Sequence, residues 1–173
     1  MRFPGRWFFG IAVMMLACDQ LVKLLQRAFV PLGTTITVIP GLFYLRSILN
    51  YGAAFSILRG QQLVFIIVAV FMTGFLVVFW VYERPHTPLP VIATALIAAG
   101  GIGNFIDRLA FGAVYDLFNV TFFPFAIFNT ADLCMTVGVI LFVIWFLFFD
   151  GLGSLSTKKT AAGYGPGQTP EGK

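Results

Sequence analysis

Charged residues are scarce in this sequence. Asp, Glu, Lys and Arg together make up 10% of the 173 residues, whereas a soluble domain carries about 25%. Hydrophobic residues make up 59%, and the mean hydropathy is +0.92. A chain with so few charges cannot cover its own surface with polar groups in water. We therefore exclude a soluble globular domain and expect lipid to surround most of the chain.

Histidine is nearly absent as well, and this limits the available chemistry. The one histidine, His86, lies in a short polar turn, and no glutamate falls within a predicted membrane span. Metal-dependent hydrolysis of the H-E-x-x-H kind is therefore disfavoured, and we predict neither a metal nor another cofactor. Serine catalysis is disfavoured too, because the serines lie in loops or in the C-terminal tail without a His or Lys placed to activate them.

Only two cysteines occur, Cys18 and Cys134, and both fall within predicted spans. We expect them to be small buried apolar groups, and nothing requires a disulfide between them. The segment that ends at Cys18 resembles a lipoprotein cleavage site, but Leu16 is too large for one and three further spans follow. We therefore interpret the first apolar run as a retained membrane span and not as a signal peptide.

Four apolar stretches are long enough to cross a bilayer, which takes roughly 20 residues. They are Trp7–Leu25, Leu63–Tyr82, Leu89–Ile106 and Ala131–Phe149. The predicted fold class is therefore mainly α, a membrane protein with four transmembrane helices in a single domain over residues 1–150. The tail, residues 151–173, is rich in Gly, Ser, Thr and Lys, which predicts a disordered segment.

The longest connection between spans carries a strand pattern. Thr34–Ile39 alternates Thr with Ile and Val, Pro40-Gly41 marks a turn, and Leu42–Leu49 is a second β-like run. The segment Asn50–Phe55 then suggests a tight turn. We predict a small extracytoplasmic β-sheet over about residues 30–60 that lies on the membrane surface. Such a sheet can hold an extended peptide by strand addition.

Polar residues near the span ends fall at helical spacing, which favours structural pairing. Asp19 and Lys23 are four residues apart with the acid first, so the pair can neutralise itself in lipid. Asn104, Asp107 and Arg108 share one helix face, and we expect Asp107 to be satisfied within this helix end. Arg108 can also face a substrate carbonyl or hold a loop. Three glycines just before Asn104 permit close helix contact.

Two further carboxylates, Asp116 and Asp132, are the strongest candidates for chemistry. Asp116 lies in the apolar loop Leu109–Phe128 without a cation at helical spacing, and a charge in such a setting is costly. Asp132 follows Asn129 by three residues, which resembles a capping box at the start of the last span. Both reach the same membrane level, so we interpret them as the catalytic pair of an aspartic protease. One ionised and one protonated carboxylate can activate water and protonate the leaving amine.

The charge distribution predicts an orientation in the membrane. Basic residues sit singly between spans, which fits anionic lipid headgroups and argues against a nucleic-acid partner. With the N-terminus inside, the cytoplasmic segments hold six basic residues and the outer loops hold four, a modest positive-inside bias. Both termini are then cytoplasmic, and Asp116 and Asp132 lie toward the extracytoplasmic face.

Five short motifs together resemble the bacterial lipoprotein signal peptidases, the type II signal peptidases. They are DQLVK with Asp19 and Lys23, NYGAAF from Asn50, GNFIDR from Gly103, VYD ending at Asp116, and FNTAD ending at Asp132. They occur in the family's order on a four-span frame, and the resemblance extends to about Phe149. Tyr115 departs from it, since an aliphatic residue is common there.

The resemblance implies an enzyme of the bacterial cytoplasmic membrane that cuts signal peptides from diacylglyceryl-modified prolipoproteins. Asp116 and Asp132 match the family's catalytic dyad. The other characteristic positions of the family match Asp19, Lys23, Asn50, Gly52, Asn104, Arg108, Asn129 and Ala131. We expect structural support from Asp19, Lys23 and Asp107, and substrate-binding or orienting roles for Asn50, Gly52, Asn104, Arg108, Asn129 and Ala131. The expected partners are the prolipoprotein and membrane lipids, with the enzyme acting as a monomer.

Two alternatives stay open at this point. A presenilin-like protease fits Tyr115-Asp116, but the sequence lacks a later Gly-x-Gly-Asp. A small transporter or scaffold with buried acids predicts polar groups at the bilayer midplane, whereas the inner half is nearly free of charge. We also hypothesise that Ala53–Leu58 moves over the site when a lipidated substrate enters sideways.

Overall fold

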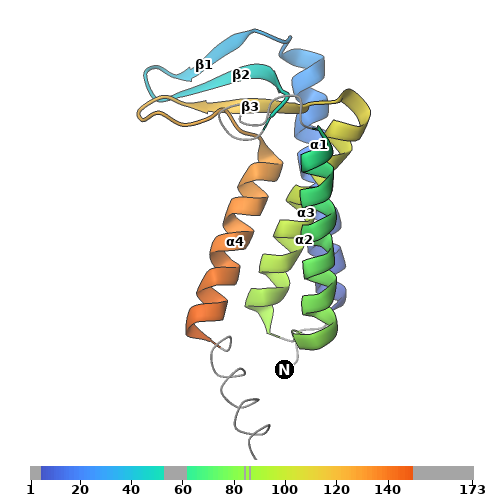
Figure 1. Cartoon of the computed structure of the whole chain (residues 1–173). Coiled ribbons are helices and arrows are strands. Elements are labelled where there is room, and N and C mark those ends of the chain that lie inside the picture. The colour runs from blue at the N-terminus through green and yellow to red at the C-terminus, as the bar shows by residue number, and fades with distance from the viewer. Residues whose placement is uncertain (1–4, 53–61, 84, 86, 150–173) are drawn as a thin grey trace, which may run out of the picture.

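The computed structural model describes residues 5–52, 62–83, 85 and 87–149. Within these residues it contains four helices and a three-stranded antiparallel sheet (Figure 1). In chain order the elements are α1 (Arg6–Phe29), β1 (Thr35–Ile39), β2 (Phe43–Asn50), α2 (Gln62–Glu83), α3 (Pro88–Phe111), β3 (Val114–Val120) and α4 (Thr130–Phe148). This confirms the predicted fold class, a mainly helical membrane protein with a small sheet.

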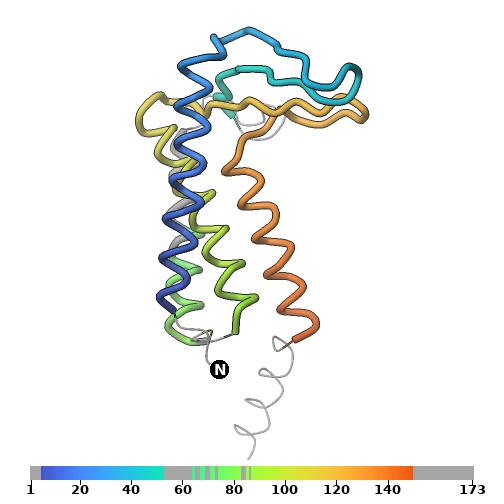
Figure 2. Tube along the Cα trace, turned by 180° about the vertical axis from the view of Figure 1, so that it is seen from behind, coloured from blue at the N-terminus to red at the C-terminus, as the bar shows by residue number. Residues whose placement is uncertain are grey.

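The helices stand side by side, and the sheet lies across one end of the bundle (Figures 1 and 2). The start of α1 and the end of α4 both lie at the opposite end. Three of the helices described, α1, α3 and α4, are long and apolar enough to cross a bilayer. The fourth, α2, has 22 residues and contacts α3 through a hydrogen bond from Trp80 Nε1 to Thr94 Oγ1.

The bundle is apolar outside and partly polar inside, as expected for a protein whose solvent is lipid. Large side chains such as Phe71, Ile140 and Phe148 point outward from their helices. The buried set includes many polar residues, namely Asp19, Lys23, Gln26, Ser47, Thr94, Asn104, Asp107, Asp116 and Asn129. Most of these lie near the end of the bundle that carries the sheet, so a functional site is expected at this end.

Helix α3 is the central element, and small residues let its neighbours approach it. A Cβ added at Gly100 would meet the Ala131 carbonyl oxygen of α4, and one at Gly103 would lie 2.5 Å from Asp19 Oδ2 of α1. The predicted close helix contact is therefore confirmed for two of the three glycines, since a Cβ at Gly101 meets nothing within 4 Å. The helix ends at Phe111, and the capping residue Gly112 has a positive φ of 69°, which suits a residue without a Cβ.

The sheet has the strand order β1-β2-β3. Strands β1 and β2 confirm the two strands predicted around Pro40-Gly41. The prediction of a continuous loop over Leu109–Phe128 was wrong, because α3 continues to Phe111 and Val114–Val120 forms β3. Strand β3 pairs with β2 and bridges to Phe128, and such distant partners are not visible in a local sequence pattern.

Other predictions differ from the structure or concern residues outside the described part of the chain. Cys134 is buried as predicted, whereas Cys18 is exposed on the outer surface of α1, and both are free thiols. Helix α1 continues four residues past the predicted end of the first span. His86, the hypothesised lid Ala53–Leu58 and the tail 151–173 lie outside the described residues.

We expect Gly100→Ala to lower stability by roughly 1–3 kcal/mol, because the new methyl group would overlap the Ala131 carbonyl oxygen and lie 3.1 Å from the Met135 amide nitrogen. The neighbouring substitution Gly101→Ala is the matched control and should leave stability unchanged or slightly higher. Thermal unfolding in detergent measures both. Equal melting temperatures for the two variants would contradict the close packing of α3 on α4.

Candidate active site

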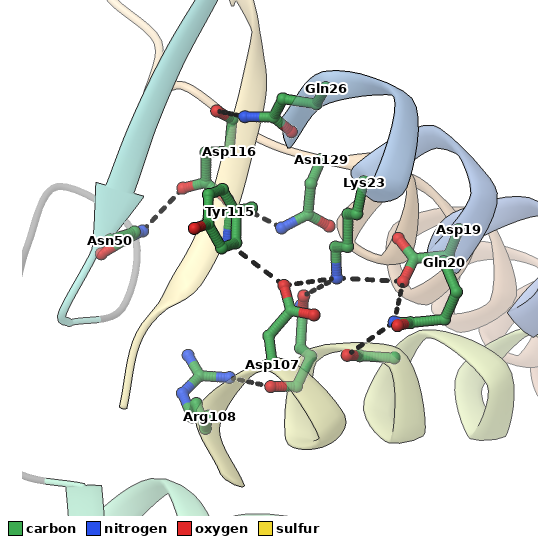
Figure 3. Close-up of polar contacts among 12 residues, drawn as sticks. Asp19, Gln20, Lys23, Gln26, Asn50, Asp107, Arg108, Tyr115, Asp116 and Asn129 are labelled. Carbon is green, nitrogen blue, oxygen red and sulfur yellow. Dashed lines mark hydrogen bonds and ion pairs between the residues drawn. The ribbon is translucent and has the colours of Figure 1, made fainter. Parts of the chain in front are cut away.

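Asp116 lies in β3 with its side chain buried at 1% exposure. Both carboxylate oxygens accept hydrogen bonds from asparagine amides: Oδ2 from Asn50 Nδ2 at 2.9 Å, and Oδ1 from Asn129 Nδ2 at 2.7 Å (Figure 3). Asn50 ends β2 and Asn129 caps α4, so three elements meet at this one carboxylate. A buried charge is tolerated only when its oxygens are bonded in this way.

Asp132 lies in the first turn of α4 and forms a capping box with Asn129, as the sequence predicts. The Asn129 side chain accepts from the Asp132 amide at 3.0 Å, and Asp132 Oδ2 accepts from the Asn129 amide at 3.1 Å. Asp132 Oδ1 also accepts from Asn104 Nδ2 of α3 at 2.7 Å. Asn129 therefore bonds to both carboxylates and brings them into one site.

The asparagines around the two acids are each oriented by a donor on their amide oxygen. Asn129 Oδ1 accepts from the Asp132 amide, Asn50 Oδ1 accepts from the Gly52 amide at 2.9 Å, and Asn104 Oδ1 accepts from Lys23 Nζ at 3.2 Å. An amide whose oxygen is occupied by a donor must turn its NH₂ group the other way. In all three cases the NH₂ group then faces a carboxylate.

The surroundings of Asp116 raise its pKa from 3.8 to about 6. The main cause is burial, which disfavours the charged form, and the negative charge of Asp132 acts in the same direction. The hydrogen bonds from Asn50 and Asn129 and the charge of Lys23 oppose the rise without cancelling it. Because the two charges interact, the titration of Asp116 is coupled to that of Asp132.

A buried cluster of three charged side chains, Asp19, Lys23 and Asp107, is linked to the site through the bond from Lys23 to Asn104. Lys23 Nζ lies 2.9 Å from Asp19 Oδ2 and 3.1 Å from Asp107 Oδ2 (Figure 3). The predicted pairing of Asp19 with Lys23 is confirmed. The expectation that Asp107 is satisfied within its own helix end was wrong, because its oxygen bonds to Lys23 of α1 and accepts from the Tyr115 amide of β3 at 3.1 Å.

Arg108 connects the end of α3 to the turn after β2. Its guanidinium donates to the Asn104 carbonyl oxygen from Nη1 and to the Gly52 carbonyl oxygen from Nη2, both at 3.3 Å. Gly52 thus receives Arg108 on its carbonyl while its amide orients Asn50. Ala131 is fully buried, with its carbonyl oxygen against Gly100 and its Cβ next to Gly103, so it packs α4 against α3 in this arrangement.

Gln26 is a buried site residue that the sequence analysis missed. Its Nε2 donates to the Asp116 backbone oxygen at 2.8 Å and to Ser47 Oγ at 3.1 Å. A signal for it was present, since Asp19, Lys23 and Gln26 fall at i, i+4 and i+7 and form one polar stripe on an apolar helix. Within the part of the chain that is described, no cluster of three or more His, Cys, Asp or Glu side chains is placed to hold a metal ion.

The comparisons with known proteins agree with this geometry. A family model described as signal peptidase (SPase) II, Peptidase_A8, matches residues 11–148. A protein named lipoprotein signal peptidase from Streptococcus pyogenes serotype M2 (strain MGAS10270) is 42% identical over 140 residues, which cover 80% of this chain and 91% of that protein. The protein of the same name from serotype M5 (strain Manfredo) has the same identity and coverage.

Two solved structures, both described as a bacterial membrane enzyme determined by the in meso method, superpose on this chain. The structure at 2.3 Å resolution has a TM-score of 0.77 and 29% identity, and the match covers 99% of this chain and 98% of that chain. The structure at 1.9 Å resolution has a TM-score of 0.77 and 33% identity, and covers 86% and 97%. The similarity therefore spans the helices and the sheet together.

The raised pKa of Asp116 predicts a pH-dependent stability. Between pH 3.8 and about 6 the folded state keeps a proton that the unfolded chain has lost, so this carboxyl destabilises the fold increasingly as the pH rises. The resulting loss in the free energy of unfolding is complete above pH 6 and amounts to roughly 2–3 kcal/mol. Because Asn does not titrate, Asp116→Asn should gain stability relative to wild type between pH 4 and pH 7.

Thermal unfolding in detergent across this pH range measures the difference between the two proteins. The control is Asp150→Asn, the same exchange outside the described residues. A difference between Asp116→Asn and wild type that stays constant with pH, or that shrinks as the pH rises, would show that the pKa of Asp116 is not raised.

Proposed function

The chain belongs to the signal peptidase II family, and we propose that Asp116 and Asp132 are the catalytic pair with which it removes signal peptides from diacylglyceryl-modified prolipoproteins. The observation that carries this proposal is that Asn129 forms hydrogen bonds with both acids: its side chain donates to Asp116 Oδ1, and it forms a capping box with Asp132. Two carboxylates held by one residue at the membrane-surface end of the bundle have the arrangement that aspartic peptidases need.

The reaction follows from one shared proton. The ionised carboxylate takes a proton from water as the water oxygen attacks the carbonyl carbon of the scissile peptide bond. The protonated carboxylic acid donates a hydrogen bond to the carbonyl oxygen, which gains negative charge in the tetrahedral intermediate. The C–N bond then breaks, and the amine nitrogen leaves with a proton supplied by the pair. Water attacks directly, so no acyl-enzyme forms.

The residues around the pair keep it in place. Asn50, Asn104 and Asn129 hold the carboxylate oxygens through their NH₂ groups. Arg108 and Gly52 fix the turn that orients Asn50. Preorganised polar groups of this kind lose little energy to reorganisation during the reaction.

The cluster of Asp19, Lys23 and Asp107 has a supporting role in this proposal. Lys23 joins Asp19 of its own helix to Asp107 of α3, and it also orients Asn104 toward Asp132. Asp107 in turn holds the amide of Tyr115, the residue before Asp116. The cluster therefore links the helical bundle to the strand that carries one of the two acids.

The same residues support a proposal for the placement in the membrane. Among the residues that the structure describes, three helices are long and apolar enough to span the bilayer. The polar contacts of the site join the ends of these helices to the sheet. We place the end that carries the sheet at the extracytoplasmic face of the bacterial inner membrane, with both chain termini in the cytoplasm, in line with the positive-inside bias. We propose that the enzyme acts as a monomer.

Asp116→Asn and Asp132→Asn should each reduce cleavage by at least roughly 10³-fold, because either change removes one partner of the shared proton. Purified protein in detergent is incubated with a diacylglyceryl-modified prolipoprotein, and mass spectrometry follows the loss of the signal peptide. A chelator is present throughout, so that added metal plays no part in the result.

The control is again Asp150→Asn, which should cleave at the wild-type rate. Both inactive variants must still bind the substrate and melt cooperatively, which separates lost chemistry from lost folding. Cleavage that survives in either variant would remove that residue from the mechanism.

The orientation can be tested separately by cysteine labelling. In a background of Cys18→Ala and Cys134→Ala, Thr37→Cys on the exposed strand β1 should react with a membrane-impermeant maleimide added to intact spheroplasts. Ser154→Cys in the tail should react only after the membrane is opened. The reverse pattern would contradict the proposed topology.

A further inference from the structure

Gln26 is a buried amide near the C-terminal end of α1, and its bonding partners belong to the sheet. The residue is 2% exposed. Its Nε2 donates to the backbone carbonyl oxygen of Asp116 at 2.8 Å (Figure 3) and to Ser47 Oγ of β2 at 3.1 Å. A single side chain from the first helix thus reaches both the second and the third strand.

The orientation of this amide is set by Asp116. A backbone carbonyl oxygen only accepts, so the NH₂ group of Gln26 must face it. As a result, the Gln26 Oε1 atom is buried without a hydrogen-bond partner in the described part of the chain. Leaving a buried acceptor unbonded costs stability. A residue that only filled space here would be better apolar, so the bond to Asp116 has a use beyond packing.

The contact lies at an irregularity between β2 and β3. Leu45 pairs with Phe118 and Ile48 pairs with Asp116, so β2 advances three residues while β3 advances two. The extra residue in β2 makes a β-bulge, and bulges re-aim side chains and are frequent beside active sites. Ser47, which also bonds to Gln26, lies inside this bulge. Gln26 therefore contacts the sheet where its regular pairing is interrupted.

The backbone of Ser47 forms two hydrogen bonds with the turn before β1. Its amide donates to the Thr34 carbonyl oxygen at 3.1 Å, and its carbonyl oxygen accepts from the Gly33 amide at 2.9 Å. The bulge in β2 is thus held by the turn before β1, while Gln26 holds its Oγ and the neighbouring carbonyl of Asp116. The local position of β3 depends on a helix side chain in addition to the strand ladder.

We propose that Gln26 is a positioning residue for the reaction: it holds the backbone of Asp116 at the bulge and so sets where the Asp116 carboxylate lies relative to Asp132. Asn50 and Asn129 hold the carboxylate oxygens, and Gln26 holds the other end of the same residue. This inference rests on the proposed catalytic role of Asp116. A displacement of about 1 Å at a catalytic group can cost roughly 10²-fold in rate.

Gln26→Leu tests the proposal, because it nearly keeps the volume and removes the donor. We expect kcat to fall roughly 10- to 100-fold while KM for the diacylglyceryl-modified prolipoprotein stays within about twofold, since the buried amide does not reach the substrate. Thr94→Val is the control: it nearly keeps the volume and removes a buried side-chain donor, which bonds to the Pro90 carbonyl oxygen of α3 at 2.7 Å and makes no bond to Asp116. It should leave kcat nearly unchanged.

Gln26→Glu separates positioning from packing. The carboxyl group that this substitution introduces can donate its O–H to the Asp116 carbonyl oxygen when it is protonated, but it has no donor when it is ionised. The activity of this variant relative to wild type should therefore be highest at low pH and fall as the pH rises, while the relative activity of Gln26→Leu stays low at every pH. A residue that only filled space would give no such difference between the two variants.

A kcat for folded Gln26→Leu within twofold of wild type would overturn the proposal. A Gln26→Glu variant whose activity relative to wild type does not change with pH would also overturn it. This pH profile decides the matter alone if Gln26→Leu fails to fold. Failure of the proposed function is distinguishable, because it appears as cleavage by Asp116→Asn. Full activity of Gln26→Leu with an inactive Asp116→Asn overturns the positioning role only.

Discussion

The placing of two carboxylates in one poorly hydrated site, with Asp116 buried and Asp132 partly exposed, is the constraint on which the rest of this structure depends. Burial and the charge of Asp132 together raise the pKa of Asp116, so the pair is costly to hold together. The structure offsets part of this cost with amide donors on both acids and with Lys23 behind them. In the proposed reaction the remaining cost is useful, because it makes it easier for one of the two acids to hold a proton, and a pair with one proton can act as acid and base.

Holding such a pair needs rigid neighbours, and the fold supplies them from elements far apart in sequence. Helix α3 is the common support: Asn104 bonds to Asp132 of α4, Asp107 bonds to Lys23 of α1, and Arg108 bonds to the turn after β2. These three residues occupy little more than one helical turn. The network is buried inside the protein, where polar groups without partners are costly, and this favours hydrogen bonds among its members.

Much of this arrangement is readable from the sequence by local rules. Apolar runs of about 20 residues predict the helices, alternation predicts β1 and β2, and spacing predicts the pair of Asp19 with Lys23 and the capping box of Asn129 with Asp132. The choice of Asp116 and Asp132 as the acids also needs only the sequence, because each is a charge in an apolar setting. Their catalytic role is still a prediction, although the structure places both on Asn129.

By itself, then, the sequence determined the class of protein, the helices and the first two strands, because each of these depends on neighbours within a few residues along the chain. It also named Asp116 and Asp132 as candidates for the chemistry. Only the tertiary structure decided that Val114–Val120 is a strand, that Asp107 bonds to Lys23 and that Gln26 bonds to the backbone of Asp116. In each of these cases the partner lies far away in the sequence. Periodicity shows which face of an element is polar, but the packing of the whole chain decides what that face meets.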